Sequence, residues 1–280
     1  MIKSIKILLF IFSFIIIRCS GSSVFSEKEI VIKIKGSDTM LHLTKKLVEE
    51  YSTENPSVKF RVFGGGTESG IEELLHGGID IATASRNLSS IEAKSLAEYY
   101  GSIGMYYLIA KDAVSIYVNT KSPIENLTLS ELGKIFTCEF TDLKDLNLGK
   151  GRIELAIRES GSGTRKYLKD LLIPNKEFCD SAKVFSTTEE IIEFVQNRPD
   201  GLGFGGLGLA NNVKLVSIDG IAPNVQNAKN DSYPLTRYLH FFTTRTPSVY
   251  VKKFIDWSLS PAGQLVIKKE GFIPLWEINY

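Results

Sequence analysis

Residues 30–56 decide the fold, and they read IVIKIKGSDTMLHLTKKLVEEYSTENP. Over residues 30–35 apolar and basic side chains alternate, which is the twofold period of a strand. The next four residues, Gly-Ser-Asp-Thr at 36–39, supply the hydroxyl and carboxylate groups that begin helices. Apolar residues then recur at helical spacing until Pro56, which cannot continue a helix. The segment therefore predicts a strand, a polar loop and an amphipathic helix, in that order.

The same order recurs along the chain. A strand is predicted over 58–63, a glycine-rich loop over 64–70 and a helix over 71–76. Alternating strands and helices indicate the α/β class. No Pro/Gly/Ser-rich linker divides the body, so two lobes would have to share strands that cross between them. Further segments are predicted as strands over 105–110 and 114–118, loops over 201–208 and 220–232, and capping boxes at 128–131 and 186–189.

The composition excludes several classes of protein. The chain has 280 residues, enough for one large domain or for two lobes of roughly 130 residues each. Apolar residues make up 43% and charged residues 23%, which excludes wholesale disorder. The 33 basic and 32 acidic residues give a formal charge of +1, which argues against nucleic acid as the main partner.

The N-terminus predicts export. Residues 1–18 hold three bases and no acid, so the rest of the chain carries 30 bases against 32 acids, a charge of −2. An apolar run over 7–17 leads to Cys19 and a small polar tether, which resembles a bacterial lipoprotein signal with an acylated cysteine. We expect a signal peptide over 1–18 and a lipidated tether over 19–29. Arg18 stands where that pattern prefers a small residue, so an ordinary signal peptide or an uncleaved anchor stays open. All three place the body outside the cytoplasm.

Two further cysteines leave a choice open. Cys138 and Cys179 are either paired, as an exported protein allows, or two free buried thiols. With only His42, His76 and His240 and no CxxC motif, we expect no zinc site, and no cofactor is predicted.

Three loops sit between a predicted strand and the start of a helix, at 37–39, 66–70 and 160–164. The first turn of a helix has unpaired N–H donors and a positive dipole end, so each loop is a potential anion pocket. Arg86 and Arg158 end predicted strands nearby, and an arginine fork suits a tetrahedral oxyanion. Each loop alone is equally an ordinary helix cap, and each arginine a solvated strand end. Together they indicate an oxyanion site.

Enzyme motifs are weak. Gly201-x-Gly203-x-x-Gly206 matches a dinucleotide pattern, but polar residues precede it instead of a buried strand. No Walker motif and no GxSxG elbow is present, and Ser162 has no local base. The loops therefore favour binding over turnover.

Six motifs in order resemble the phosphate-binding proteins of bacterial ABC importers, the PstS-like family. They cover residues 30–245, most of the body. The motifs are GSDTM at 36–40, GGGTESGI at 64–71, DIATASR at 80–86, RESGSGT at 158–164, GLGFGGLG at 201–208 and YPLTR at 233–237.

The resemblance implies a two-lobed, type II-like periplasmic-binding-protein fold of the α/β class. Each lobe would be a mixed sheet flanked by helices, with two crossing strands near 110–114 and 230–237. Lobe I would comprise 30–112 and 233–280, and lobe II 113–232.

The resemblance also implies the ligand residues. Arg86 departs from the branch with Asp at this position and follows a Ser-Arg branch. A proton acceptor for phosphate is expected, because donors alone would not separate it from sulfate. Asp38, Glu68 and Glu159 are the candidates, although Asp38 and Glu68 are equally helix-start charges. By motif position the resemblance implies as phosphate ligands Ser37, Thr39, the Met40 N–H, Thr67, Arg158, Ser162, Gly163 and Thr164. The predicted phosphate-binding set also includes Asp38, Glu68 and Arg86.

The sequence thus predicts an extracytoplasmic, lipid-anchored monomer that captures inorganic phosphate and hands it to an ABC permease by hinge closure. Three alternatives stay open. They are a binding protein for another tetrahedral oxyanion such as sulfate, an exported phosphoester hydrolase, and an adhesin or sensor on the same fold.

Overall fold

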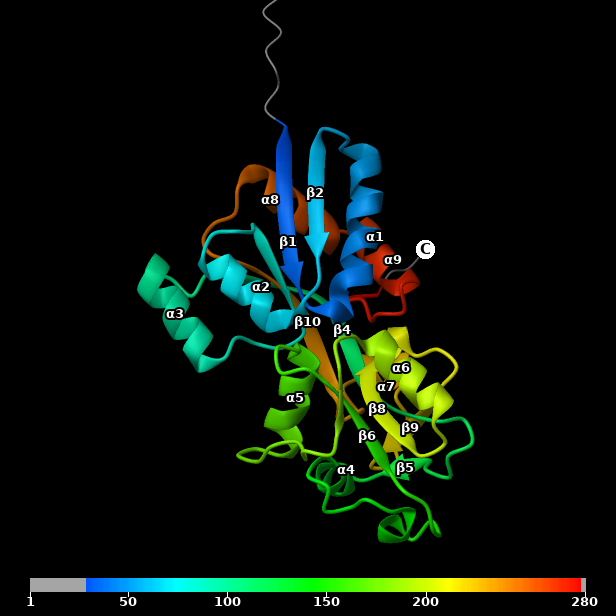
Figure 1. The fold of residues 1–280 in the computed structure, drawn as a ribbon. Coiled ribbons are helices and arrows are strands. Elements are labelled where there is room, and N and C mark those ends of the chain that lie inside the picture. Colours follow the sequence, from blue (N-terminus) through cyan, green and yellow to red (C-terminus); the bar gives the residue numbers. More distant parts are fainter. Residues whose placement is uncertain (1–28, 278–280) are drawn as a thin grey trace, which may run out of the picture.

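The computed structural model describes residues 29–277, which form two lobes joined at a narrow waist (Figure 1). The first lobe holds β1 to β3, β10 and helices α1 to α3, α8 and α9, and the second holds β5 to β9 and α4 to α7. The predicted α/β class and two-lobed form are confirmed. The predicted signal over 1–18, Cys19 and the tether, apart from Glu29, lie outside the described residues.

One mixed sheet of ten strands runs through both lobes, in the order β2-β1-β3-β10-β4-β8-β6-β7, and β9 pairs with β4 and β5. β1, β2 and β3 are parallel, whereas β10 is antiparallel to β3 and β4. The strands are β1 (Ile30–Gly36), β2 (Val58–Phe63), β3 (Ile81–Ala84), β4 (Met105–Val118), β5 (Asn126–Leu127), β6 (Glu154–Arg158), β7 (Lys183–Phe185), β8 (Gly201–Gly206), β9 (Lys214–Ile218) and β10 (Thr236–Thr243).

Helices cover both faces of the sheet in the first lobe: α1, α8 and α9 pack on one face and α2 on the other. Within residues 29–277 no helix has the length and apolar character needed to cross a bilayer. The helices are α1 (Asp38–Glu54), α2 (Gly66–Leu75), α3 (Ser90–Tyr100), α4 (Leu129–Phe136), α5 (Gly163–Leu172), α6 (Thr188–Asn197), α7 (Val225–Lys229), α8 (Val249–Leu259) and α9 (Pro261–Lys269), with short 3-10 turns at Leu143–Leu146 and Leu207–Leu209.

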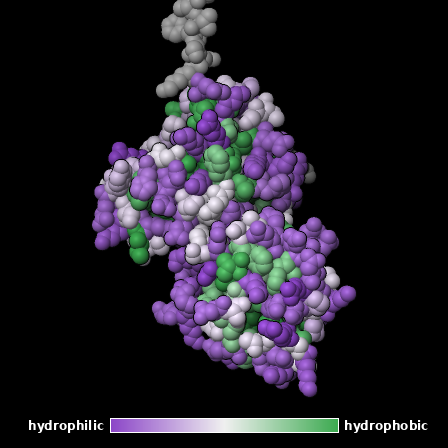
Figure 2. All heavy atoms as spheres, in the orientation of Figure 1, coloured by the Kyte–Doolittle hydropathy of each residue, from purple (hydrophilic) through white to green (hydrophobic). Residues whose placement is uncertain are grey.

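Each lobe has its own hydrophobic interior. In the first, Ile32 and Ile34 of β1 pack with Leu43 and Leu47 of α1, so the predicted strand and helix over 30–56 are confirmed. The predicted loops are shorter than expected, because only Ser37 separates β1 from α1, and α2 begins at Gly66 within the loop predicted over 64–70. The second lobe has a separate cluster of buried apolar side chains, which includes Phe136. Figure 2 shows apolar residues gathered within each lobe, with hydrophilic and neutral residues between the two groups. The waist is therefore a polar seam between two cores.

The prediction of two strands over 105–110 and 114–118 was wrong, because β4 is one strand of 14 residues. It pairs with β10 through Ala113 and with β8 from Val114 onward, so it crosses from one lobe to the other. Lys111 and Asp112 lie between the two predicted strands, where they are buried and form ion pairs with Asp231 and Arg237, respectively. Pairing partners distant in the sequence keep the strand continuous.

The prediction of a loop over 201–208 was also wrong, because Gly201–Gly206 is the fully buried strand β8. A side chain at Gly203 would meet Ile191 at 2.3 Å, and one at Gly205 would meet Thr188 at 2.4 Å. The glycines therefore let helix α6 lie directly on the strand. The predicted loop over 220–232 contains the short helix α7.

The capping box predicted at 128–131 is confirmed, with Thr128 as the N-cap of α4. The one predicted at 186–189 is displaced by one residue, because Thr187 caps α6 and pairs with Glu190. Ser89 caps α3.

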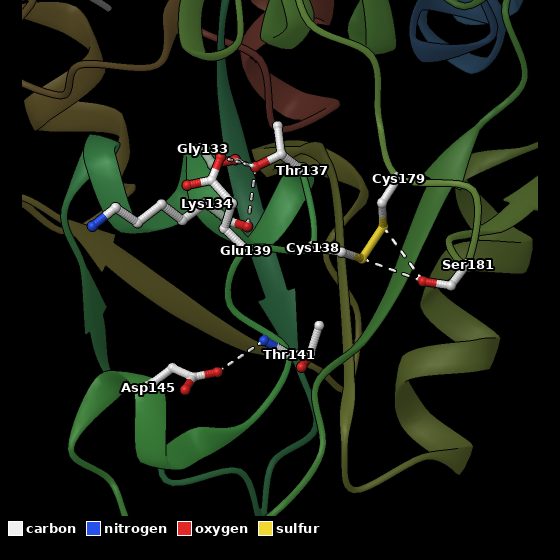
Figure 3. Close-up of a disulfide and its surroundings, with 9 residues drawn as sticks. All are labelled: Gly133, Lys134, Thr137, Cys138, Glu139, Thr141, Asp145, Cys179 and Ser181. Carbon is white, nitrogen blue, oxygen red and sulfur yellow. Dashed lines mark hydrogen bonds between the residues drawn. A yellow bond between two sulfur atoms is a disulfide. The ribbon is translucent and has the colours of Figure 1, made fainter.

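A disulfide joins Cys138, just after α4, to Cys179, in the segment before β7 (Figure 3). The Cα atoms are 5.5 Å apart, and the Ser181 hydroxyl lies 3.3 Å from the Cys138 sulfur. Of the two alternatives left open by the sequence, the paired one is correct. The bond ties together two second-lobe segments that are 41 positions apart.

Replacing both Cys138 and Cys179 by serine should lower the free energy of unfolding of the second lobe. Opening a loop of this length restores chain entropy to the unfolded state worth about 3–4 kcal/mol. Urea unfolding of the variant and of the wild type, each with and without dithiothreitol, measures the effect. The reductant should shift only the wild-type midpoint. Equal midpoints in all four experiments would show that the bond adds no stability.

Candidate functional site

Three helices begin at the waist, α1 and α2 from the first lobe and α5 from the second (Figure 1). Their N-caps are Ser37, Gly65 and Ser162. Ser37 is 2% exposed, and its hydroxyl makes no cap bond to its own helix. Gly65 has a φ of 104°, a conformation that favours glycine. Three helix N-termini with their N–H donors and positive dipole ends thus point toward one region.

Buried hydroxyls from both lobes meet in this region. The Thr39 Oγ1 of the first lobe lies 3.2 Å from the Thr164 Oγ1 of the second. The Thr67 Oγ1 accepts a hydrogen bond of 3.2 Å from the backbone N–H of Ser85. Gly163 of the second lobe packs so closely that an added side chain would lie 2.3 Å from the Thr67 hydroxyl. The lobes are therefore in contact through polar groups.

Arg158, at the end of β6, is the first cation of the site. Its Nη2 donates to the Asp38 Oδ2 across the lobes at 2.7 Å, and its Nη1 donates to the Thr188 Oγ1 at 3.2 Å. Its Nε is buried without a hydrogen-bond partner among the described residues. The Asp38 Oδ1 accepts from the Gly65 N–H at 2.8 Å. The Arg158 Nη2 also donates to the Ser186 carbonyl at 2.5 Å. Arg158 is thus paired with Asp38, while its buried Nε–H makes no hydrogen bond within the protein as described.

Arg237 of β10 is a second buried cation, which the sequence analysis noted only as part of a family segment. Its Nη2 and Nε donate to the Asp112 Oδ2 at 2.7 and 3.1 Å. Its Nη1 donates to the Thr164 Oγ1 at 2.9 Å and to the Ser85 carbonyl at 3.2 Å. The sequence could have indicated this pair, because Asp112 lies in the predicted crossing near 110–114 and Arg237 in the one near 230–237.

Arg86 makes no hydrogen bond to the residues of this set, although its Nε, like that of Arg158, is buried without a partner among residues 29–277. Its guanidinium donates twice to Glu92, at 2.7 Å each, and Glu92 completes the N-terminal cap of α3 with Ser89. Burial acts to raise the pKa of Glu92, but hydrogen bonds from Arg86 and Ser89 outweigh it and hold the pKa below its usual value. The structure gives Arg86 a role in closing a helix cap.

Other predicted residues are also engaged elsewhere. The Met40 N–H donates to the Ser37 carbonyl at 3.0 Å, and the Ser162 hydroxyl accepts from the Arg165 N–H at 3.3 Å. Glu68 and Glu159 are exposed, and the Glu68 N–H donates to the Gly161 carbonyl of the other lobe at 3.2 Å.

The residues that do converge supply hydroxyl and guanidinium donors and two carboxylates, those of Asp38 and Asp112. Those from the predicted set are Asp38, Thr39, Thr67, Arg158, Gly163 and Thr164, and the structure adds Ser85, Asp112 and Arg237. Ser37 is buried at the N-cap of α1, next to Asp38.

Hydroxyls, helix N–H groups and guanidinium together match the acceptor oxygens of a small oxyanion. Among residues 29–277, no three His, Cys, Asp or Glu side chains are grouped to hold a metal ion. In the same part of the chain, no side-chain base hydrogen-bonds to Ser162. This set of donors can bind and orient a small oxyanion.

Two lobes joined by crossing strands, with a polar set from both lobes between them, define a ligand-binding protein of the two-lobed kind. Residues 23–262 match the PBP superfamily domain, and the chain belongs to this family.

Related proteins share this architecture. The phosphate-binding protein PstS of Pseudomonas aeruginosa is 29% identical over 86% of this chain and 81% of its own. That of Borreliella burgdorferi is 26% identical over 97% and 98%. Among solved structures, a phosphate ABC transporter substrate-binding protein of Clostridium perfringens with bound phosphate superposes with a TM-score of 0.81, at 25% identity over 88% of this chain and all of that one.

His240 on β10 should make folding sensitive to acid. Burial, and then the charge of Arg237, lower its pKa from 6.5 to about 4. The folded protein keeps this histidine neutral while the unfolded chain takes up a proton, so stability is lost as the pH falls from about 6.5 to about 4. The loss is on the order of 3 kcal/mol.

Urea unfolding of the wild type and of His240→Phe between pH 7 and pH 4 measures how much of the loss of stability comes from His240. The variant should lose less stability over that window than the wild type does. The exposed His76, changed to Gln, controls for removing a histidine elsewhere. Parallel curves for wild type and His240→Phe would contradict the assignment.

Proposed function

We propose that this chain captures inorganic phosphate between its lobes and delivers it to the permease of an ABC importer. The observation that carries the proposal is the meeting of donors from both lobes at one point, where Thr39 and Thr164 lie 3.2 Å apart. The related PstS proteins, and the similar structure with bound phosphate, support phosphate as the anion. Hydroxyls and guanidinium groups suit its tetrahedral oxygens.

We expect the two lobes to close around the anion, because each lobe holds only part of the donor set. Thr39 and Thr67 belong to the first lobe, whereas Arg158 and Thr164 belong to the second. An anion can satisfy both groups only when the lobes are together, so it stabilises the closed state relative to an open one. The pair between Asp38 and Arg158 would have to break on opening.

Asp38 is the best placed of the three candidate proton acceptors. It is mostly buried and contacts Arg158, whereas Glu68 and Glu159 are exposed. A carboxylate has further lone pairs beyond the two hydrogen bonds it accepts here. Asp38 can therefore accept a proton that phosphate carries near neutral pH and sulfate lacks.

The remaining elements of the proposal concern the whole chain. We place lobe I at 30–112 and 233–280 and lobe II at 113–232, supported by the change of β4 partners after Ala113. Tyr233 and Leu235 pack in the second core, so the returning chain joins lobe I at about Thr236, three residues after the predicted boundary at 233. An extracytoplasmic location and a lipid on Cys19 rest on the sequence of residues 1–23. We expect a monomer that binds its anion without turnover.

Arg158→Ala should weaken phosphate binding by about 2–5 kcal/mol, since it removes a buried cation and leaves Asp38 unpaired beside the anion. Calorimetric titration of the purified protein with phosphate measures this. Arg198→Ala is the matched control, because Arg198 is half exposed and pairs with Glu154 away from the site. Its affinity should equal that of the wild type. A Kd for Arg158→Ala within a few-fold of wild type would remove Arg158 from the site.

Asp38→Asn should narrow the preference for phosphate over sulfate. The amide keeps the size of the side chain but can donate to sulfate and no longer carries a carboxylate for a phosphate proton. Titration of wild type and variant with both anions at pH 7 gives the two affinity ratios. An unchanged ratio would move the acceptor role away from Asp38. Sulfate binding as tight as phosphate in the wild type would favour a general oxyanion carrier.

A further inference from the structure

Arg237 contacts threonine hydroxyls of both lobes. Its Nη1 donates to the Thr164 Oγ1 at 2.9 Å, and its Nη2 lies 3.5 Å from the Thr39 Oγ1. The two hydroxyl oxygens are themselves 3.2 Å apart. All three side chains are at most 4% exposed. Arg237 is therefore buried next to the point where Thr39 of the first lobe meets Thr164 of the second.

The hydrogen-bond count of Arg237 distinguishes it from Arg158. A guanidinium has five N–H bonds and no acceptor. Its Nε and one Nη2 hydrogen go to Asp112, the other Nη2 hydrogen faces Thr39, and the Nη1 hydrogens go to Thr164 and to the Ser85 carbonyl. Every N–H of Arg237 thus has a partner in the protein. A direct bond to a ligand would require one of these to break.

The effect of Arg237 falls instead on the hydroxyls. A threonine hydroxyl has one hydrogen and can either donate or accept. An oxygen that accepts from a guanidinium must aim its own hydrogen elsewhere, because arginine cannot accept it. Thr39 and Thr164 are therefore turned into donors by the same cation. In this structure one of the two hydrogens lies between the hydroxyls themselves, whose oxygens are 3.2 Å apart. Since they come from opposite lobes, an acceptor that enters between them would replace this contact and receive both hydrogens.

The cation itself is held rigidly. Asp112 lies directly opposite Arg237 in the β4–β10 ladder, and its other oxygen accepts from the Leu207 N–H at 3.3 Å. The Tyr167 ring of α5 lies 5.7 Å from the guanidinium carbon, and the Tyr167 hydroxyl donates to the Thr236 carbonyl at 3.0 Å. Contacts from both lobes thus fix the guanidinium plane.

We propose that Arg237, oriented by Asp112, is a positioning residue that commits the Thr39 and Thr164 hydroxyls as donors to the bound anion. The inference rests on the proposed function, because the anion used to test it is inorganic phosphate. Asp112 neutralises the arginine, so the contribution lies in hydrogen-bond direction more than in net charge.

A double-mutant cycle separates positioning from a purely structural ion pair. Calorimetry with inorganic phosphate is done on the wild type, Arg237→Lys, Thr164→Val and the double variant. Lysine keeps the charge but lacks the fork that reaches Asp112 and both hydroxyls. We expect Arg237→Lys to weaken binding about tenfold or more. In the Thr164→Val background the same change should cost at least about threefold less.

Lys111→Gln is the matched control. Lys111 precedes Asp112 on β4 and forms its own ion pair with Asp231, but it contacts neither threonine. Its thermal midpoint should fall while phosphate affinity stays that of the wild type. If Arg237→Lys does not fold, Asp112→Asn replaces it in the same cycle, because it keeps the arginine and loosens its hold.

Three outcomes would overturn the inference: an Arg237→Lys affinity within twofold of wild type, effects of the two changes that simply multiply, or an equal loss of affinity in Lys111→Gln. Failure of the wild type to bind phosphate would instead contradict the proposed function, and it is seen before any variant is made.

Discussion

The ion pair between Arg237 and Asp112 joins the two crossing strands where the lobes meet. The residues are direct partners in the β4–β10 ladder, and both side chains are almost fully buried. Burying either charge alone would cost several kcal/mol, so the fold is stable only when they face each other. A one-residue slip of β10 would turn Arg237 to the other face of the sheet. The pair therefore helps to set the register of the strands, and with it the position of the loops that each lobe contributes.

The same rule governs the other buried arginines. Arg158 is held by Asp38 and Arg86 by Glu92, so each cation has its acid within hydrogen-bond distance. The chain after residue 18 carries a charge of −2, and an anion cannot be drawn in by net charge. Binding must come from local dipoles: helix N-termini, hydroxyls and an arginine with a free N–H. The structure supplies these at one seam between two separate cores.

Much of the fold could be predicted because its signals are local. The alternation in β1, the helical spacing in α1 and the capping boxes at Thr128 and Thr187 each lie within a few residues. The errors arose where the residues that pack on or pair with a segment lie far from it in the sequence. The glycines of 201–206 indicate a loop until helix α6 is placed on them, and the strands predicted over 105–110 and 114–118 form one strand because β10 and β8 pair along it.

The sequence by itself determined the α/β class, the polar strand-to-helix turns before α1, α2 and α5, and the arginine at the end of β6, because helix caps and strand ends are made by neighbouring residues. Only the tertiary structure decided which charges meet at the waist. Arg86 looked as suitable as Arg158, but six residues on it meets Glu92, whereas Arg237 meets Asp112 from 125 positions away. It also paired Cys138 with Cys179, which the spacing left open. Partners of charged and thiol groups depend on which segments the sheet brings together, and no local pattern records that.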